Sequence, residues 1–242
     1  MASSTTGSDD ADSTPFGYHL PEFVDWIAGA VIALVGLVLT VGGTVLAFAV
    51  DQDTLRESVQ SGELTVVIFE RELTEAETLE VAQAVANWTG WGLLVTGVLL
   101  VLFAVGYVVV RHRAHTAAGP DESAGSYLSA AVVGAVVTAF VSFIPFSPAI
   151  GGGVAGYLES LRSERGIGPG ALSGLLGAAP LLVILLFVTA GLYVGLASVS
   201  AAGLEVVTVA VMLVAGLFAT VFAVGLGAVG GYIGGRIADS WT

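Results

Sequence analysis

The chain has 242 residues, of which 55% are hydrophobic and only 11% are charged, a composition typical of a membrane protein rather than a soluble domain. Acidic residues outnumber basic ones 20 to 7, every basic residue is arginine, and the formal net charge is −13. The absence of cysteine excludes disulfides, thiolate metal sites, iron–sulfur clusters and cysteine nucleophiles.

The acidic excess without lysine is typical of proteins that stay hydrated in molar salt. At that ionic strength the Debye length falls to roughly 3 Å, so closely spaced like charges cost little. We infer a halophilic archaeal source, and a merely acidic membrane protein is the alternative. The chain has no basic stripe for nucleic acid, so a nucleic-acid partner is not expected.

Five long stretches of the chain carry no charge, and each is long enough to cross a bilayer as a helix, which takes roughly 20 apolar residues. They are Trp26–Val50, Val81–Val110, Ser123–Leu158, Gly166–Leu204 and Val206–Gly235. The predicted fold is an all-α, polytopic membrane helix bundle in the cell membrane. It has four full spans, a broken or re-entrant helical hairpin and a small acidic extracellular loop domain.

The first part of the chain predicts a tail and a transmembrane hairpin. Residues 1–19 are polar and lack a positive region, which predicts a disordered acidic tail rather than a cleaved signal peptide. Residues 20–113 form the hairpin, and Arg111 and Arg113 follow its second span. The positive-inside rule places these arginines, and by parity the N-terminus, in the cytoplasm, so the loop 51–87 is extracellular.

The loop region has its own expected structure. The β-branched and aromatic run Glu63–Glu70 predicts one short strand. Thr74 and Glu77 form a capping box, which predicts a helix that enters the second span without a break and ends near Arg111. Asn87 opens an Asn-Trp-Thr sequon and is a candidate glycosylation site, although the adjacent Trp88 indicates a position close to the membrane surface.

A cytoplasmic linker, 114–126, separates the hairpin from a glycine-rich C-terminal membrane unit, 127–238. The uncharged stretch Ser123–Leu158 has a cytoplasmic segment at both ends and so needs an even number of passes. Pro145 and Pro148 supply the break, and Ser142 and Ser147 lie beside them as candidate pore or hinge residues. As a helix the outward arm, Tyr127–Ile144, spans roughly 27 Å, just enough to cross, whereas the return arm is short for a full crossing. Two crossings and a re-entrant hairpin therefore both remain open.

Two segments of this unit match each other at a separation of 75 residues, namely Gly153–Leu158 (GVAGYL) and Ala228–Ile233 (AVGGYI). The match indicates an internal repeat, with chance recurrence of Gly, Val and Ala as the alternative. The run Ile144–Leu158 (IPFSPAIGGGVAGYL), followed by Gly166–Gly174 (GIGPGALSG), resembles a domain of unknown function found in haloarchaeal membrane proteins. The resemblance covers about residues 127–238 and implies a source and a membrane location but no activity.

Glycines recur at helical spacing and predict close helix contacts, because small residues let helix backbones approach in lipid. Gly29, Gly36 and Gly43 are spaced by seven residues. Three further groups are spaced by four residues within each group: Gly152 and Gly156; Gly170 and Gly174; and Gly227, Gly231 and Gly235. The contacts lie either within one subunit or between subunits in a glycine zipper. The triple in the first span is the best candidate for the second arrangement.

No residue is predicted to be catalytic, to bind a metal or to hold a cofactor. Gly225–Gly230 matches a dinucleotide fingerprint but follows an apolar span rather than a strand. Ser173 lacks a neighbouring base, and His112 and His115 alone make a weak metal site.

Two functions therefore compete, and neither is enzymatic. The first is an integral structural or accessory protein that forms a homo-oligomer or joins a larger membrane complex through its glycine faces. The second is a passive channel or small-solute transporter that uses the broken helix near Pro145–Pro148.

Overall fold

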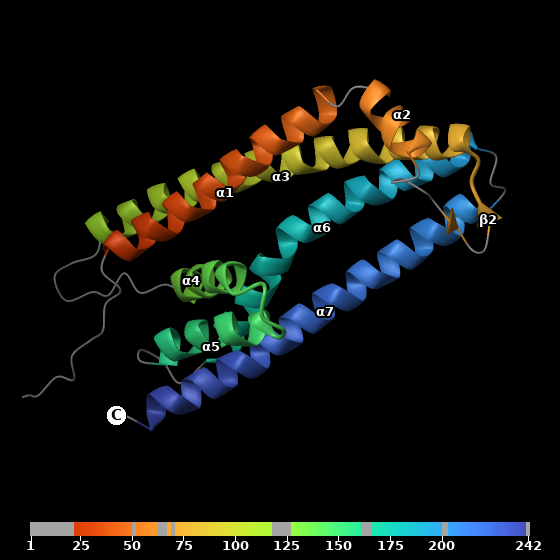
Figure 1. Cartoon of the computed structure of the whole chain (residues 1–242). Coiled ribbons are helices and arrows are strands. Elements are labelled where there is room, and N and C mark those ends of the chain that lie inside the picture. Colours follow the sequence, from red (N-terminus) through yellow and green to blue (C-terminus); the bar gives the residue numbers. More distant parts are fainter. Residues whose placement is uncertain are drawn as a thin grey trace, which may run out of the picture.

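The computed structural model describes residues 22–49, 52–61, 67–68, 71–117, 127–160, 166–199 and 203–240. The predicted tail 1–19 and most of the linker 114–126 lie outside these residues. Within them the chain is an elongated bundle of helices with one very small pair of strands (Figure 1). The predicted class, a helix bundle with four long apolar helices and a broken hairpin, is confirmed.

Four helices are long and apolar enough to span a membrane. They are α1 (Glu22–Phe48), α3 (Glu75–Ala117), α6 (Ile167–Ser198) and α7 (Leu204–Asp239), with 27, 43, 32 and 36 residues. Because about 20 apolar residues cross the hydrocarbon core as a helix, all four exceed the requirement. Most large apolar side chains along them are exposed in the single chain, as expected of surfaces that face lipid.

The bundle has two distinct ends (Figure 1). At one end α1 begins and α3 and α7 finish; we call it the arginine end because it carries Arg111, Arg113 and Arg236. The opposite loop end holds α2 (Gln52–Gln60) and two antiparallel strands, β1 (Val67–Ile68) and β2 (Arg71–Glu72).

The loop end differs in detail from the expected single strand. Of the predicted Glu63–Glu70 strand the structure describes Val67 and Ile68; both are extended, as β1, and pair with the two residues of β2. The predicted capping box is present: the Thr74 N–H donates to Glu77 Oε2 (2.9 Å), and the Glu77 N–H donates to Thr74 Oγ1 (3.3 Å). The helix α3 runs from there without a break but continues past Arg111 to Ala117, into the predicted linker.

The broken hairpin consists of α4 (Tyr127–Phe140) and α5 (Ser147–Ser160). Each has 14 residues, or about 21 Å at 1.5 Å per residue, which is short of the ~30 Å hydrocarbon core. The sequence predicted an outward arm of full length over Tyr127–Ile144, and this was wrong because α4 already ends at Phe140. Both arms are half-spans, as in a re-entrant hairpin.

Glycine contacts fix the register of the packed helices. The pairs α1–α3, α3–α6, α6–α7 and α4–α5 are antiparallel, whereas α5 and α7 run parallel. Gly152 lies against Gly227 and Gly156 against Gly231, so the offset between the contacting helices is the same 75 residues that separates the two matching sequence segments. The two similar segments therefore lie side by side in the fold.

Candidate functional site

The most chemically distinctive site is a buried charged cluster at the arginine end, where α1, α3 and α4 meet. Its centre is Asp25, in the first turn of α1, a position where an acidic side chain is favoured by the helix dipole. The residue is nevertheless only 1% exposed. An acid taken out of water in this way needs partners, because burying an unpaired charge is very costly.

Asp25 has four polar partners. Its Oδ1 accepts hydrogen bonds from the hydroxyl of Tyr107 and from Ser129 Oγ (2.7 Å). Its Oδ2 accepts a hydrogen bond from Arg111 Nε (2.8 Å) and lies 3.2 Å from His115 Nε2. Tyr107 and Ser129 also lie 3.2 Å apart. We call these five residues the Asp25 cluster.

The sequence places three members of the cluster on one face of α3. Tyr107, Arg111 and His115 are spaced by four residues, so their side chains stack along the same side of the helix. The face is turned toward Asp25 because Gly29, one turn further along α1, lets the two helices approach: a Cβ at Gly29 would collide with Val108. Ser129, from the first turn of α4, completes the cluster from the other half of the molecule.

The electrostatics of the cluster are those of a satisfied buried ion pair. Arg111 is 4% exposed and its guanidinium balances the charge of Asp25, while the Tyr107 and Ser129 hydroxyls donate to the other carboxylate oxygen. Removal of either charged partner would leave the other buried and unpaired. His115, with a side chain 22% exposed, connects the cluster to the surface. The arrangement can lock three helices together, and neither pocket described below is lined by Asp25.

The neighbouring histidine does not join the cluster. His112 Nδ1 lies 2.9 Å from Glu22 Oε1 on the exposed side of the α1–α3 pair, whereas His115 points to Asp25. The two histidines thus contact different carboxylates. Among the described residues no group of three or more His, Cys, Asp and Glu side chains is arranged to hold a metal ion.

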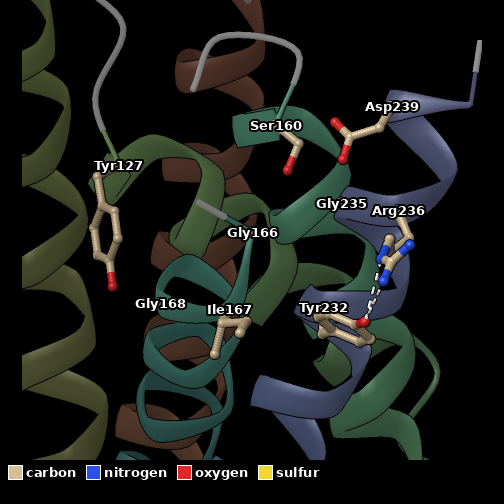
Figure 2. A pocket seen from close by; sticks show the side chains of 9 residues that line it. All are labelled: Tyr127, Ser160, Gly166, Ile167, Gly168, Tyr232, Gly235, Arg236 and Asp239. Carbon is tan, nitrogen blue, oxygen red and sulfur yellow. Dashed lines mark hydrogen bonds between the residues drawn. The ribbon is translucent and has the colours of Figure 1, made fainter. Parts of the chain in front are cut away.

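A second polar feature is a pocket of about 580 Å³ at the arginine end, between α4, α5, α6 and α7. Figure 2 shows Tyr127 on one side of it and Tyr232 with Arg236 on the other. Arg236 donates from Nε and Nη2 to the Tyr232 hydroxyl (3.1 and 2.9 Å), and its guanidinium lies 5.4 Å from the tyrosine ring centroid. This pocket is wide and open, and its one arginine is held by the tyrosine one turn earlier in the same helix.

The glycines predicted to pack helices lie in close contacts within the chain. Gly29, Gly36 and Gly43 all face α3; a Cβ on Gly36 would come 2.7 Å from the Gly97 carbonyl oxygen. The triple in the first span is therefore already covered by the chain's own α3. This overturns the interpretation that made it the best candidate for contact between subunits.

The C-terminal glycines contact one another across three helices. A Cβ on Gly152 or Gly156 of α5 would collide with Gly227 or Gly231 of α7, and one on Gly170 would collide with Gly227 from the α6 side. The remaining two of the set behave alike: Gly174 lies against Ala223, and Gly235 lies against Ser160 and Gly166.

The candidate hinge residues form the tip of the broken hairpin. Ser142 and Pro145 lie in the turn between α4 and α5, and Ser147 and Pro148 open α5. Phe146, between the two prolines, has a φ of 67°, a left-handed backbone that is strained for a bulky residue. The tip is apolar and exposed, with Phe140, Phe143 and Phe146 at its surface.

Asn87, the candidate glycosylation residue, lies exposed on the continuous helix α3 rather than in a loop. Trp88 beside it packs near Phe187 of α6, with ring centroids 6.1 Å apart. Ser173 is fully buried, and its hydroxyl has no hydrogen-bond partner among the described residues.

Sequence reasoning missed the Asp25 cluster. Asp25 and Arg111 each stand at the edge of an apolar stretch, where charges usually meet water, and they are 86 residues apart. The available signal was the polar stripe of Tyr107, Arg111 and His115 at four-residue spacing on an otherwise apolar helix. Arg111, which the sequence predicts only as a signal of membrane orientation, is therefore also a buried structural residue of the fold.

Comparison with known proteins places part of the chain. Residues 128–237, a little under half of the chain, match a family of unknown function (DUF5518). The matched part comprises α4 to α7, and of the Asp25 cluster it includes Ser129 alone. No curated protein and no solved structure matches the chain.

Proposed function

We propose that this chain is an integral membrane protein with a structural or accessory role, rather than an enzyme or a pump. The observation that supports this role is the Asp25 cluster, in which the buried charges are fully used in holding α1, α3 and α4 together. Proton-coupled transporters instead use intramembrane carboxylates along a path through the protein. Here the buried carboxylate lines neither pocket, and many of the remaining helix contacts are made by glycines.

The proposed orientation has both termini and the arginine end in the cytoplasm and the loop end outside. It follows from Arg111, Arg113 and Arg236, which lie together at one end of the bundle, since arginines near span ends stay on the cytoplasmic side. The lack of cysteine makes a direct test simple. An impermeant thiol reagent added to whole cells should label Ser61→Cys at the loop end and leave Ser240→Cys at the arginine end unlabelled. The reverse pattern would overturn the orientation.

The acidic composition supports a halophilic environment for this protein. With 20 acidic and 7 basic residues, the aqueous segments repel themselves at low ionic strength. We expect the thermal unfolding temperature in detergent to rise continuously as potassium chloride is increased to molar concentration. A protein from an ordinary environment should instead show little change beyond about 0.15 M, where the Debye length is already about 8 Å.

Self-assembly or membership of a larger complex remains part of the proposal. Much of the surface of α7 is apolar and exposed in the single chain, with Leu217, Phe218 and Phe222 along its middle. Native mass spectrometry from mild detergent should therefore release an assembly larger than one chain. If only the monomer were found under every detergent condition, self-assembly would be wrong and the exposed apolar surface of α7 would be explained by contact with lipid alone.

Passive conduction is the second candidate, because discontinuous helices build midplane sites in transporters. The broken hairpin favours it, whereas the exposed phenylalanines at the tip oppose it. Liposomes containing the protein should leak common ions and small solutes no faster than empty liposomes. If flux exceeded that level and changed in the Ser142→Ala or Pro145→Ala variant, the protein would conduct solutes and the structural role would be wrong.

A further inference from the structure

Two cavities of the bundle differ in the groups that they present to a ligand. A crevice of about 290 Å³ lies between α1, α3, α4 and α6, where α4 stops at Phe140, and its walls are apolar apart from Thr96. The pocket of about 580 Å³ at the arginine end instead presents a charged residue, Arg236, together with tyrosine and serine hydroxyls (Figure 2). This pocket therefore contains groups that can select a polar ligand.

Arg236 is a cation that no carboxylate neutralises within the described part of the chain. It is exposed, and its only polar partner there is the hydroxyl of Tyr232. Arg111, by contrast, is buried and paired with Asp25. Arg236 therefore presents an open positive charge to a ligand in the pocket.

Tyr232 holds this guanidinium in place. Its oxygen accepts hydrogen bonds from Nε and Nη2 of Arg236, and its ring centroid lies 5.4 Å from the guanidinium. A guanidinium carries five N–H donors, so three remain after these two bonds. A positioned guanidinium with free N–H groups suits a phosphate or a carboxylate, to which it donates charge-assisted hydrogen bonds.

The first turn of α6 adds neutral donors. Gly166, Ile167 and Gly168 line the pocket, and the cap residue Gly166 provides no side-chain hydrogen bond to this turn. The first N–H groups of a helix have no acceptor within the helix, and with the helix dipole they favour an anion. Ser160, which lies beside Gly166, lines the same pocket, and its hydroxyl makes no hydrogen bond within the described part of the chain.

Asp239 limits the charge of the ligand. It is the one acid among the described lining residues, and its side chain extends toward Ser160 in Figure 2. A phosphate monoester, whose second pKa is about 6, carries close to two negative charges at neutral pH, and the nearby carboxylate repels the second charge. A phosphate diester carries one negative charge, which Arg236 balances. The charges of the pocket therefore favour a diester.

The pocket also lies at the level where lipid phosphates are found. Arg236 directly follows the uncharged stretch Val206–Gly235, and arginine and tyrosine are typical of the border between membrane and water. Two exposed apolar side chains are close by, namely Ile167 in the pocket and Ile233, next to Tyr232 on α7. They offer contact to the apolar chains of a lipid.

We propose that this pocket binds the phosphate diester of a membrane lipid, with Arg236, Ser160 and the first N–H groups of α6 donating hydrogen bonds to the phosphate oxygens. The volume of about 580 Å³ falls within the ~300–1,000 Å³ range of ligand pockets. The inference rests on the membrane location of the chain, but on neither its orientation nor its structural role. A chain that conducted solutes could bind the same lipid, and a chain without this site could still be structural.

The test uses the purified full-length protein in mild detergent, with phosphatidylglycerol and a diacylglycerol of the same chains as matched probes. Native mass spectrometry gives the affinity for one added lipid. We expect Arg236→Gln to weaken binding of phosphatidylglycerol by roughly tenfold to a hundredfold, the value of a charge-assisted hydrogen bond, and to leave binding of diacylglycerol unchanged. An equal loss for the two lipids, or no loss for either, would overturn the proposal.

Two further variants locate the site. Arg113 is exposed at the same end of the bundle but does not line the pocket, so Arg113→Gln should bind phosphatidylglycerol as the wild type does. Ile167→Trp fills the pocket from an exposed position and should weaken binding of phosphatidylglycerol. If Arg113→Gln lost as much affinity as Arg236→Gln, or if Ile167→Trp lost none, the lipid would lie elsewhere and the assignment would be wrong.

Two other probes separate a lipid diester from other sources of phosphate. Inorganic phosphate at the concentration of the lipid should not displace phosphatidylglycerol; displacement would show that the pocket takes free phosphate, and the lipid assignment would be wrong. The wild type should bind phosphatidic acid, a monoester, more weakly than phosphatidylglycerol. Asp239→Asn should reduce this preference. An unchanged preference in that variant would contradict the selection of a diester by Asp239.

Discussion

The two halves of this molecule differ in the contacts that hold their helices together. In the N-terminal hairpin, glycine contacts between α1 and α3 are supplemented by the buried Asp25–Arg111 ion pair, and Ser129 of α4 joins this pair of helices through its hydrogen bond to Asp25. The helices α5, α6 and α7 are joined by glycine backbones with hardly a polar side chain between them. Apolar side chains alone give little driving force for helix association in lipid, and the chain shows both available solutions, polar bonds and close backbone contact.

The difference teaches how each contact can fail. The Asp25 cluster concentrates its stabilisation in a few atoms, so loss of one charge leaves its partner buried and unpaired. The glycine contact spreads its stabilisation over many van der Waals contacts, each weak, and fails when a side chain is added rather than removed. Substitutions that remove atoms should therefore harm the first contact, and substitutions that add atoms should harm the second.

The largest effect is expected from Asp25→Ala. It leaves the Arg111 guanidinium buried without its carboxylate, which we expect to destabilise the fold by about 3–5 kcal/mol. Thermal unfolding in mild detergent measures the loss. Glu22→Ala, in the same first turn but exposed, should change the unfolding temperature very little.

The cause of that loss can be separated from the loss of shape. Arg111→Met removes the guanidinium but keeps most of the chain length, so the double variant Asp25→Ala/Arg111→Met has no unpaired charge. It should recover a large part of the stability lost in Asp25→Ala. If the double variant were as unstable as the sum of the two single variants, the two residues would not act as a buried pair.

The next largest effect is expected from Gly231→Leu. A Cβ at this position already meets the Gly166 carbonyl oxygen and Gly170 of α6, so the added side chain must force α6 and α7 apart. We expect a loss of about 1–3 kcal/mol or more, as for overpacked cores. Gly225→Leu is the matched control, because Gly225 lies on the same helix with open space around its Cβ position. Equal stability of the two variants would remove the contact role from Gly231.

A smaller effect is expected from Ser129→Ala, which removes the hydrogen bonds from α4 to the N-terminal hairpin. Interhelical hydrogen bonds in membrane proteins average about 0.6 kcal/mol, and a loss of this size is expected here. A double-mutant cycle with Tyr107→Phe should show coupling, since the two hydroxyls contact Asp25 and each other. Additive losses would mean that the two hydroxyls bond independently.

Much of the fold could be predicted from the sequence because its signals are local. Charge-free stretches locate the long helices, the Thr74–Glu77 capping box begins α3, and the prolines at 145 and 148 predict the broken hairpin. The spacing of glycines predicts a contact face. The spacing does not show which helix packs against that face. For this reason Gly29, Gly36 and Gly43 were considered for contact between subunits, although they pack against α3 of the same chain.

The candidate site was less accessible to sequence reasoning, because its members come together only in the folded bundle. Asp25 and Ser129 are 104 residues apart and come from different halves of the chain. Asp25 also stands where an acidic residue is ordinary, in the first turn of a helix. The apolar crevice depends on where α4 stops, and the sequence predicted that helix to extend further than Phe140.

The comparison that best separates the role of glycine in helix contact from its low helix propensity comes from Gly106→Ala on α3. Nothing lies within 4 Å of a Cβ at Gly106, so alanine adds no clash and the higher helix propensity should raise stability by up to about 1 kcal/mol. On the same helix a Cβ at Gly97 would collide with Thr40 of α1, so Gly97→Ala should lower stability despite the same gain in propensity. Opposite signs in thermal unfolding would show that glycine is needed at Gly97 for contact. If both variants gained stability, the α1–α3 interface would be looser than its backbone contacts indicate.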